Sequence, residues 1–276
     1  MPKFIVGARL HDYGKGSPDE LFGRVAADGF AAVQLAYKKC VPSVRSYADV
    51  TDALVAETVA AEKAHSIQVA VLGTYVELAI NDESRLKNAA DFKSQLAVCK
   101  ALGAGCIGTE TTGMEKQPAG TTREEAQELL CRSLADILPA AEALGVTVAV
   151  EPVTYHSMNS AAATRHILDT MRSPNLKVIF DMSNLVDAGN VGAQDRIWND
   201  VGELLGDQIV AVHFKGQAFA PDGGLLHTSL EDSLTDYAGA FAMLRQLPQD
   251  ALPVLREEAV PARAASDIAF MRGFFA

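Results

Sequence analysis

The sequence predicts a closed (β/α)8 barrel, an α/β fold in which eight parallel strands are each followed by a helix. Short apolar runs alternate with amphipathic helical stretches along all 276 residues, which is typical of parallel strands joined by right-handed crossovers. Eight such units occur, the number that closes a barrel of this length. No Pro/Gly-rich linker or change of composition divides the chain, so residues 1–276 are expected to form one domain.

The expected strands are short runs rich in β-branched and small apolar residues. They span residues 4–10, 31–36, 68–72, 106–109, 147–151, 177–181, 209–213 and 253–257. The first helix begins at Ser17-Pro18, where serine suits the N-cap and proline the first turn, and ends near Gly29. The later helices are expected at 51–65, 83–102, 121–144, 161–172, 195–205, 235–247 and 262–275. A long loop is expected between the seventh strand and the helix at 235–247.

The charge and cysteine content limit the environment and partners of the chain. A formal net charge of −11 argues against nucleic acid and anionic membranes, which are bound through excess Lys and Arg. No signal-peptide pattern or long apolar stretch is present, so a cytoplasmic protein is expected. The four cysteines have no CxxC spacing, and buried free thiols are expected. The expected partner is a small molecule, and a homodimer or homotetramer is compatible with the sequence.

Ionisable residues end the last four expected strands. Glu151 ends the fifth, Asp181 the sixth and His213 the seventh, while the eighth ends in Glu257 and Glu258. A charged group at the end of a buried strand requires a partner, and the C-terminal ends of barrel strands meet at one face, where active sites lie. Three carboxylates and one imidazole suit one divalent cation, namely Mn²⁺, Mg²⁺, Co²⁺ or Zn²⁺.

Side-chain alternation along a strand indicates which residues face the barrel interior. An inward Glu151 implies an inward Ala149, and inward Asp181 and His213 imply inward Ile179 and Ala211. On the eighth strand, an inward Glu257 places Leu255 inside, whereas an inward Glu258 would bury Arg256 in the barrel. Glu257 is therefore the predicted fourth ligand.

Several motifs resemble those of a known family. They are VEP at Glu151, FDMSN at Asp181, VHFKG at His213 and LPVLREE at Glu257, with support from GARLHDYGK, DGFAAVQLA and LGAGCIGTETTG. Along its whole length, the chain resembles the xylose isomerase-like TIM barrel superfamily, specifically its sugar phosphate isomerase/epimerase branch, which contains the ketose 3-epimerases. The resemblance implies that the four strand-end residues bind one divalent metal ion and that Glu151 and Glu257 also act as acid and base.

The sequence departs from the family pattern at three positions that contact substrate. Asn184 stands where the family often has a histidine, and Phe219 stands where the ketose epimerases have an arginine. Ser157 replaces their acidic residue, although His156 is adjacent. The resemblance thus extends to the metal ligands and not to the substrate contacts.

Five residues are predicted to bind substrate: His11, Glu110, His156, Asn184 and Lys215. Structural roles are the alternatives, namely loop capping for His11, orientation of a ligand for Glu110, and an ion pair with Glu110 or Asp181 for Lys215. No Gly-rich phosphate-binding loop follows the seventh or eighth strand and the net charge is strongly negative, so an unphosphorylated substrate is expected. Lys215 and Arg9 are the two side chains that could instead meet a phosphate or carboxylate.

The function predicted from these features is a metal-dependent isomerase or epimerase of a small sugar or sugar-derived polyhydroxy carbonyl compound, in carbohydrate metabolism. One glutamate would remove a carbon-bound proton and the other would return one, through a metal-bound enediolate. Two alternatives stay open: a metal-dependent dehydratase of an inosose-like or dehydroshikimate-like ring, and a non-catalytic sugar-binding barrel, which would be expected to lack one or more of the four ligands.

Overall fold

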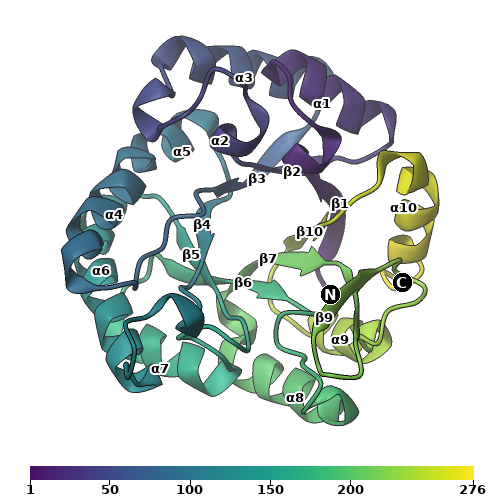
Figure 1. The fold of residues 1–276 in the computed structure, drawn as a ribbon. Coiled ribbons are helices and arrows are strands. Elements are labelled where there is room, and N and C mark those ends of the chain that lie inside the picture. Colours follow the sequence, from purple (N-terminus) through teal and green to yellow (C-terminus); the bar gives the residue numbers. More distant parts are fainter.

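The computed structural model describes residues 1–276 and contains a closed barrel of eight parallel strands, as predicted. Around the barrel the strand order is β1-β10-β7-β6-β5-β4-β3-β2, and helices form a ring outside it (Figure 1). The barrel strands are β1 (Lys3–Arg9), β2 (Ala32–Leu35), β3 (Gln68–Gly73), β4 (Cys106–Glu110), β5 (Val148–Glu151), β6 (Leu176–Asp181), β7 (Ile209–Phe214) and β10 (Ala251–Arg256).

The outer helices have the ends that their sequences predict. In α1, the Ser17 side chain accepts from the Glu20 backbone N–H while the Glu20 carboxylate accepts from the Ser17 N–H, a capping box that satisfies two free donors. Thr122 and Glu125 do the same for α6, which ends at Gly145 with a φ of 68°. The helices are α1 (Pro18–Ala27), α2 (Tyr37–Cys40), α3 (Asp52–His65), α4 (Asp82–Ser94), α5 (Leu96–Leu102), α6 (Arg123–Leu144), α7 (Ala161–Met171), α8 (Gln194–Leu205), α9 (Tyr237–Leu244) and α10 (Ala264–Arg272).

Two apolar layers hold the barrel together. The larger layer, of 64 buried residues, lies mainly between strands and helices. The smaller one fills the barrel with mostly small side chains: Ala32, Ala70, Val71, Cys106, Ala149, Ile179, Ala211 and Leu255. The predicted inward positions of Ala149, Ile179, Ala211 and Leu255 are therefore confirmed. Glycine is required at position 7, since a Cβ there would lie 2.5 Å from the backbone carbonyl oxygen of Ala32 as well as 2.5 Å from a Leu255 methyl.

The single helix expected at 83–102 is wrong, because the structure has two helices there. Gln95 adopts φ −92° and ψ −5° between α4 and α5, and its N–H donates to the carbonyl of Phe92, three residues back. The buried Gln95 side chain donates to the Tyr47 carbonyl. Because Tyr47 is distant in sequence, the helical period of residues 83–102 could not indicate this contact.

The long loop expected after the seventh strand instead contains a β-hairpin of β8 (Gly216–Phe219) and β9 (Leu225–Thr228). Its turn includes Pro221-Asp222-Gly223, where Gly223 has a φ of 87° and donates to the Ala220 carbonyl. Proline, aspartate and glycine favour turns for defined conformational reasons, so the sequence indicates this turn. It does not indicate the two strands, because four residues each are too few to show alternation.

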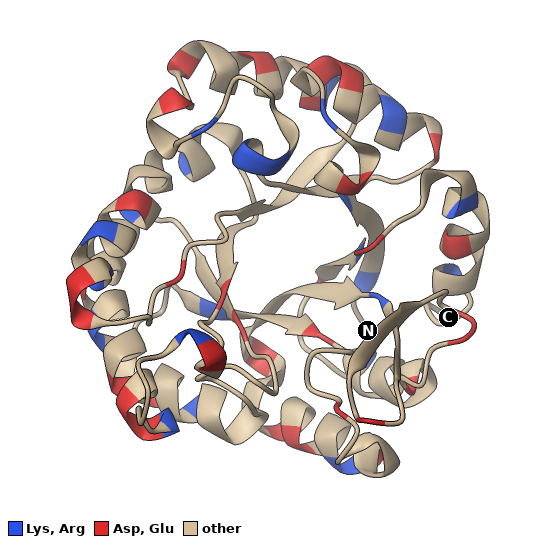
Figure 2. Cartoon of the chain, viewed as in Figure 1, with Lys and Arg blue, Asp and Glu red and all other residues tan.

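All four cysteines are free, as expected, and Cys40, Cys99 and Cys106 are buried; Cys131 is only half-buried, in contrast to the prediction. No helix combines the length and the apolar character needed to cross a bilayer. Many of the charged residues lie on the outer helices, while a few acidic ones mark strand ends at the centre of the barrel (Figure 2).

Candidate metal centre and adjoining pocket

Four neighbouring strands bring the predicted ligands together at the C-terminal end of the barrel. Glu151 is the last residue of β5, Asp181 the last of β6, and His213 the last but one of β7. Glu257 follows β10 directly, and its N–H still donates to the Phe214 carbonyl of β7, so it continues the alternation of the strand. All four side chains are buried, and none is more than 3% exposed.

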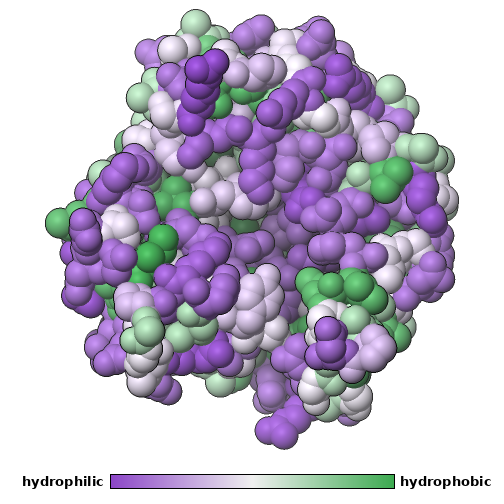
Figure 3. Space-filling view, in the orientation of Figure 1, coloured by the Kyte–Doolittle hydropathy of each residue, from purple (hydrophilic) through white to green (hydrophobic).

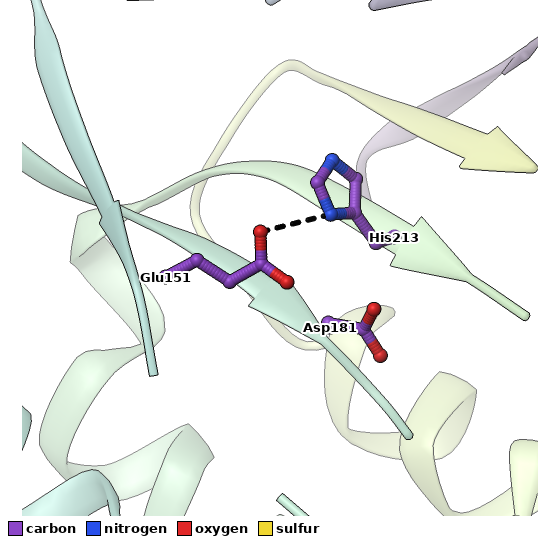
Figure 4. A group of neighbouring side chains, drawn as sticks. All are labelled: Glu151, Asp181 and His213. Carbon is purple, nitrogen blue, oxygen red and sulfur yellow. Dashed lines mark ion pairs between the residues drawn. The ribbon is translucent and has the colours of Figure 1, made fainter. Parts of the chain in front are cut away.

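The imidazole of His213 lies at the centre of the group. Its Nδ1 is 3.1 Å from Glu151 Oε2 and 3.4 Å from Glu257 Oε1. One ligand atom each from Glu151, Asp181 and His213 lies within 4.8 Å of the others, and Figure 4 shows these side chains on three neighbouring strands. Glu257 lies beside this cluster and contacts it at His213 Nδ1.

The cluster fits a divalent cation because buried donor atoms in it lack hydrogen-bond partners. They are Asp181 Oδ2 and both ring nitrogens of His213. Asp181 Oδ1 is already occupied, since it accepts from the N–H groups of Ser183 at 2.7 Å and Asn184 at 2.9 Å. Buried polar atoms without partners are rare and require an explanation. Carboxylate oxygens with one imidazole nitrogen form a ligand set for Mg²⁺, Mn²⁺ or Zn²⁺.

Asn184 holds the first of these carboxylates in place. Its side-chain nitrogen donates to Glu151 Oε1 at 2.7 Å, which leaves Oε2 directed at His213. The amide therefore orients a ligand in the structure, as such outer contacts commonly do at metal sites. The predicted contact between Asn184 and substrate stays a prediction.

Lys215 places an ammonium among the carboxylates. Its Nζ is 3.0 Å from Asp181 Oδ2 and 3.5 Å from Glu257 Oε2, and the residue is 7% exposed. Of the two ion-pair partners considered for it, the structure selects Asp181. In the structure Lys215 therefore contacts two predicted metal ligands and does not line the adjoining pocket.

The surrounding charges shift the pKa values of the two glutamates in opposite directions. Burial alone would raise the pKa of Glu257, but His213, Lys215 and Arg9 outweigh it and lower that pKa to about 2. Burial raises the pKa of Glu151, against the opposing effect of His213. For His213, burial favours the neutral ring, but Glu257 and Glu151 prevail and raise its pKa to about 9.

A small pocket adjoins the cluster and is lined by both glutamates and His213. Its other polar lining comes from Gln34, Tyr75, Thr109 and Glu110. Burial, and then the neighbouring Glu151, raise the pKa of Glu110 to about 7. Figure 3 shows hydrophilic residues around a hollow near the centre of this face, so the opening suits a small polar molecule.

The remaining predicted substrate contacts lie further from the ligands. The ring of His11 packs edge-on against Tyr75, with Nε2 3.5 Å from the Tyr75 hydroxyl. His156 is buried beneath Tyr155 and does not line the pocket. Of the five predicted contacts, Glu110 alone is part of the pocket lining.

An arginine network beside Glu257 was not predicted from the sequence. Arg9, the last residue of β1, donates to Asp12 Oδ1 from Nε at 3.0 Å and Nη2 at 2.8 Å. Its guanidinium also contacts Glu258 at 2.7 Å and lies 3.8 Å from Glu257 Oε1. Asp12 in turn accepts from the Ala259 N–H. The signal was present, because Arg9 ends a barrel strand at the same face as the ligands.

The buried His156 predicts an acid-sensitive stability. Burial lowers its pKa to about 4, below the value of about 6.5 expected in the unfolded chain. Between about pH 6.5 and 4 the unfolded state binds the proton first, so the free energy of unfolding should fall as the pH falls through this window. We expect His156→Gln to reduce this slope in urea unfolding measured across it. The control is His166→Gln, an exposed histidine of α7; an equal reduction there would contradict the assignment.

The fold and site define a class, namely (β/α)8 barrels that carry a ligand set suited to a divalent cation at the C-terminal end of the strands. The chain belongs to the xylose isomerase-like TIM barrel family, whose model matches residues 22–273. A comparison with curated protein sequences finds no significant match.

Solved structures with the same fold include two described as epimerases or epimerase-like. The 3-keto-D-glucoside 4-epimerase of E. coli is 17% identical with a TM-score of 0.72, over 98% of this chain and 100% of that one. A D-tagatose 3-epimerase-like protein is 11% identical with a TM-score of 0.77, over 98% and 96%. An IOLI protein with a bound zinc atom is 15% identical with a TM-score of 0.76, over 98% and 96%. At these identities the likeness shows the fold alone.

Proposed function

We propose that this protein is a metal-dependent isomerase or epimerase of a small sugar or sugar-derived polyhydroxy carbonyl compound. The observation that carries the proposal is the pair of buried glutamates on β5 and after β10, both in contact with the same nitrogen of His213, at 3.1 and 3.4 Å. Two carboxylates held at one centre, beside a polar pocket, are what removal and return of a carbon-bound proton require.

Glu151, Asp181, His213 and Glu257 would hold the cation, which supplies Lewis acidity at the substrate carbonyl and a neighbouring hydroxyl. Manganese is our first choice among Mn²⁺, Mg²⁺, Co²⁺ and Zn²⁺, because three of the four donors are carboxylates. The solved structure of similar fold with a bound zinc atom supports a divalent metal in general.

The glutamates carry out the proton transfers. One of Glu151 and Glu257 takes the proton from the carbon next to the carbonyl, and the electron pair moves into the carbon–carbon bond as the carbonyl oxygen gains charge. The other glutamate donates a proton to the opposite side of the planar carbon, which inverts it. Asn184 keeps Glu151 in position through its 2.7 Å hydrogen bond.

The pocket favours an unphosphorylated substrate. Glu110, Glu151 and Glu257 line it, and carboxylates repel a phosphate. Arg9 is occupied by Asp12 and Glu258 and is not free to bind one. We therefore place the protein in the metabolism of free sugars. From the sequence we also propose a cytoplasmic location and a homodimer or homotetramer.

A dehydratase acting on a cyclic polyhydroxy ketone is the second candidate. It stays open because Asn184 and Phe219 stand where the resemblance places a histidine and a substrate-binding arginine of the ketose epimerases; Phe219 occupies a half-buried position of the β8–β9 hairpin. Such an enzyme would begin with the same proton abstraction and then expel a hydroxyl group as water, so the products separate the two candidates.

Incubation with a panel of ketoses, sugar acids and inososes in deuterated water tests the proposal. We expect one substrate to gain deuterium at carbon and give an isomer of equal mass apart from that label. A chelator should abolish turnover and Mn²⁺ should restore it. A product lighter by one water would establish the dehydratase instead, and full activity of metal-free protein would contradict the metal-dependent mechanism.

A further inference from the structure

The ammonium of Lys215 occupies a position that a cation bound by the cluster would need. Lys215 is two residues beyond His213 and directly follows β7, so alternation directs both side chains into the mouth of the barrel. Its Nζ lies between Asp181 Oδ2, at 3.0 Å, and Glu257 Oε2, at 3.5 Å. The contacts of Nζ are therefore with two of the four predicted ligands.

The charge balance of the cluster explains this position. Three carboxylates, those of Glu151, Asp181 and Glu257, are buried with at most 3% exposure. Buried charges are strongly unfavourable without opposite charges nearby. The ammonium of Lys215, 3.0 Å from Asp181 and 3.5 Å from Glu257, supplies such a charge to two of these carboxylates.

The contact with Asp181 is an ion pair and lacks hydrogen-bond geometry, because Asp181 Oδ2 has no hydrogen-bond partner in spite of the short distance. Asp181 Oδ1 is fully engaged by two backbone N–H groups. Oδ2 is thus the free oxygen through which Asp181 would bind a metal ion. The ammonium and the metal ion require the same atom.

Two hydrogen bonds fix the backbone of Lys215. The Lys215 carbonyl accepts from Ser183 Oγ and from the Tyr237 hydroxyl, both at 2.8 Å. A lysine side chain is a flexible four-carbon stem, so Nζ can leave Asp181 without disturbing the strand.

We propose that Lys215 is an internal counter-ion which the divalent cation displaces from Asp181 and Glu257. The inference rests on the proposed function for the identity of the site, and it adds a competition between the lysine ammonium and the cation for the same carboxylate oxygens.

Calorimetric titration with Mn²⁺ alone, without substrate, tests the displacement. A positive charge within about 4–6 Å of a carboxylate changes its affinity for a proton by about 1–3 pKa units, each a tenfold change in the binding constant, and the same charge should oppose binding of a metal cation. We therefore expect Lys215→Met to bind Mn²⁺ about 10-fold or more tightly than the wild type, and the metal-free variant to melt at a lower temperature. Lys39→Met is the control, since it removes an exposed charge at the same mouth, held over the Tyr75 ring. We expect it to change the affinity by less than about threefold, because exposed charges are screened.

Equal or weaker Mn²⁺ binding by Lys215→Met would overturn the displacement and would leave the proposed function intact. Absence of binding to both proteins would overturn the metal centre itself. If Lys215→Met does not fold, Lys215→Gln, which is also neutral, should show the same tighter binding. A tenfold effect of Lys39→Met would likewise overturn the inference, because the net charge at the mouth would then explain it.

Discussion

Replacing Glu257 by glutamine should abolish most exchange of the substrate's carbon-bound proton with solvent deuterium while substrate still binds. The carboxamide keeps the shape and one oxygen donor, but it loses the basic lone pair and the charge. Loss of general acid–base catalysis costs about 10²–10⁴-fold in rate, while an amide oxygen remains a weaker ligand for a hard cation. The exchange rate at saturating metal, followed by proton NMR, is the measurement.

Glu258→Gln provides the matched control one residue further along. The Glu258 side chain is 41% exposed and pairs with Arg9 outside the cluster, on a backbone with a φ of 55°. We expect exchange in this variant within about threefold of the wild type, since the altered group contacts no ligand atom of the cluster and only its exposed ion pair is weakened. Loss of exchange in Glu258→Gln with normal exchange in Glu257→Gln would invert the assignment. Normal exchange in both would contradict the two-glutamate mechanism.

Replacing Asp267 by alanine should unfold the protein at much lower urea concentration. Asp267 on α10 is 1% exposed and accepts from Arg256 Nε at 2.8 Å; Arg256 is 3% exposed. Removing one partner of a buried ion pair leaves an uncompensated charge and costs about 3–5 kcal/mol of unfolding free energy. Arg256 also donates to the Glu257 carbonyl, so the same change should disturb the position of the Glu257 carboxylate, which we propose is catalytic.

The double variant Arg256→Met/Asp267→Leu distinguishes the lost pair from lost packing. Well-packed apolar replacements of a buried pair are often neutral or stabilising, so we expect it to recover most of the stability that Asp267→Ala loses. An unchanged urea midpoint for Asp267→Ala would show that the pair contributes nothing. A double variant as unstable as the single one would assign the loss to packing.

Much of the fold, and the convergence of the four predicted ligands, followed from the alternation of strand residues and the period of the helices. The alternation of strand residues distinguished Glu257 from Glu258, because an inward Glu258 would have buried Arg256 in the barrel. The same alternation placed Ile179 and Leu255 inside, where they fill the barrel. The barrel rule then brought four strand ends to one face. These inferences succeed because they depend only on local geometry and on the order of the strands.

The sequence by itself thus determined the barrel, its strand positions and the convergence of Glu151, Asp181, His213 and Glu257. The tertiary structure alone decided what surrounds them: the amide of Asn184 on Glu151, the ammonium of Lys215 on Asp181 and the Arg9 network beside Glu257. It also decided the break at Gln95, whose side chain binds the Tyr47 carbonyl. The physical reason is the separation in sequence of the residues that interact. Alternation and helical period are properties of neighbouring residues, whereas these contacts join segments dozens of residues apart, whose distances are set only when the barrel closes.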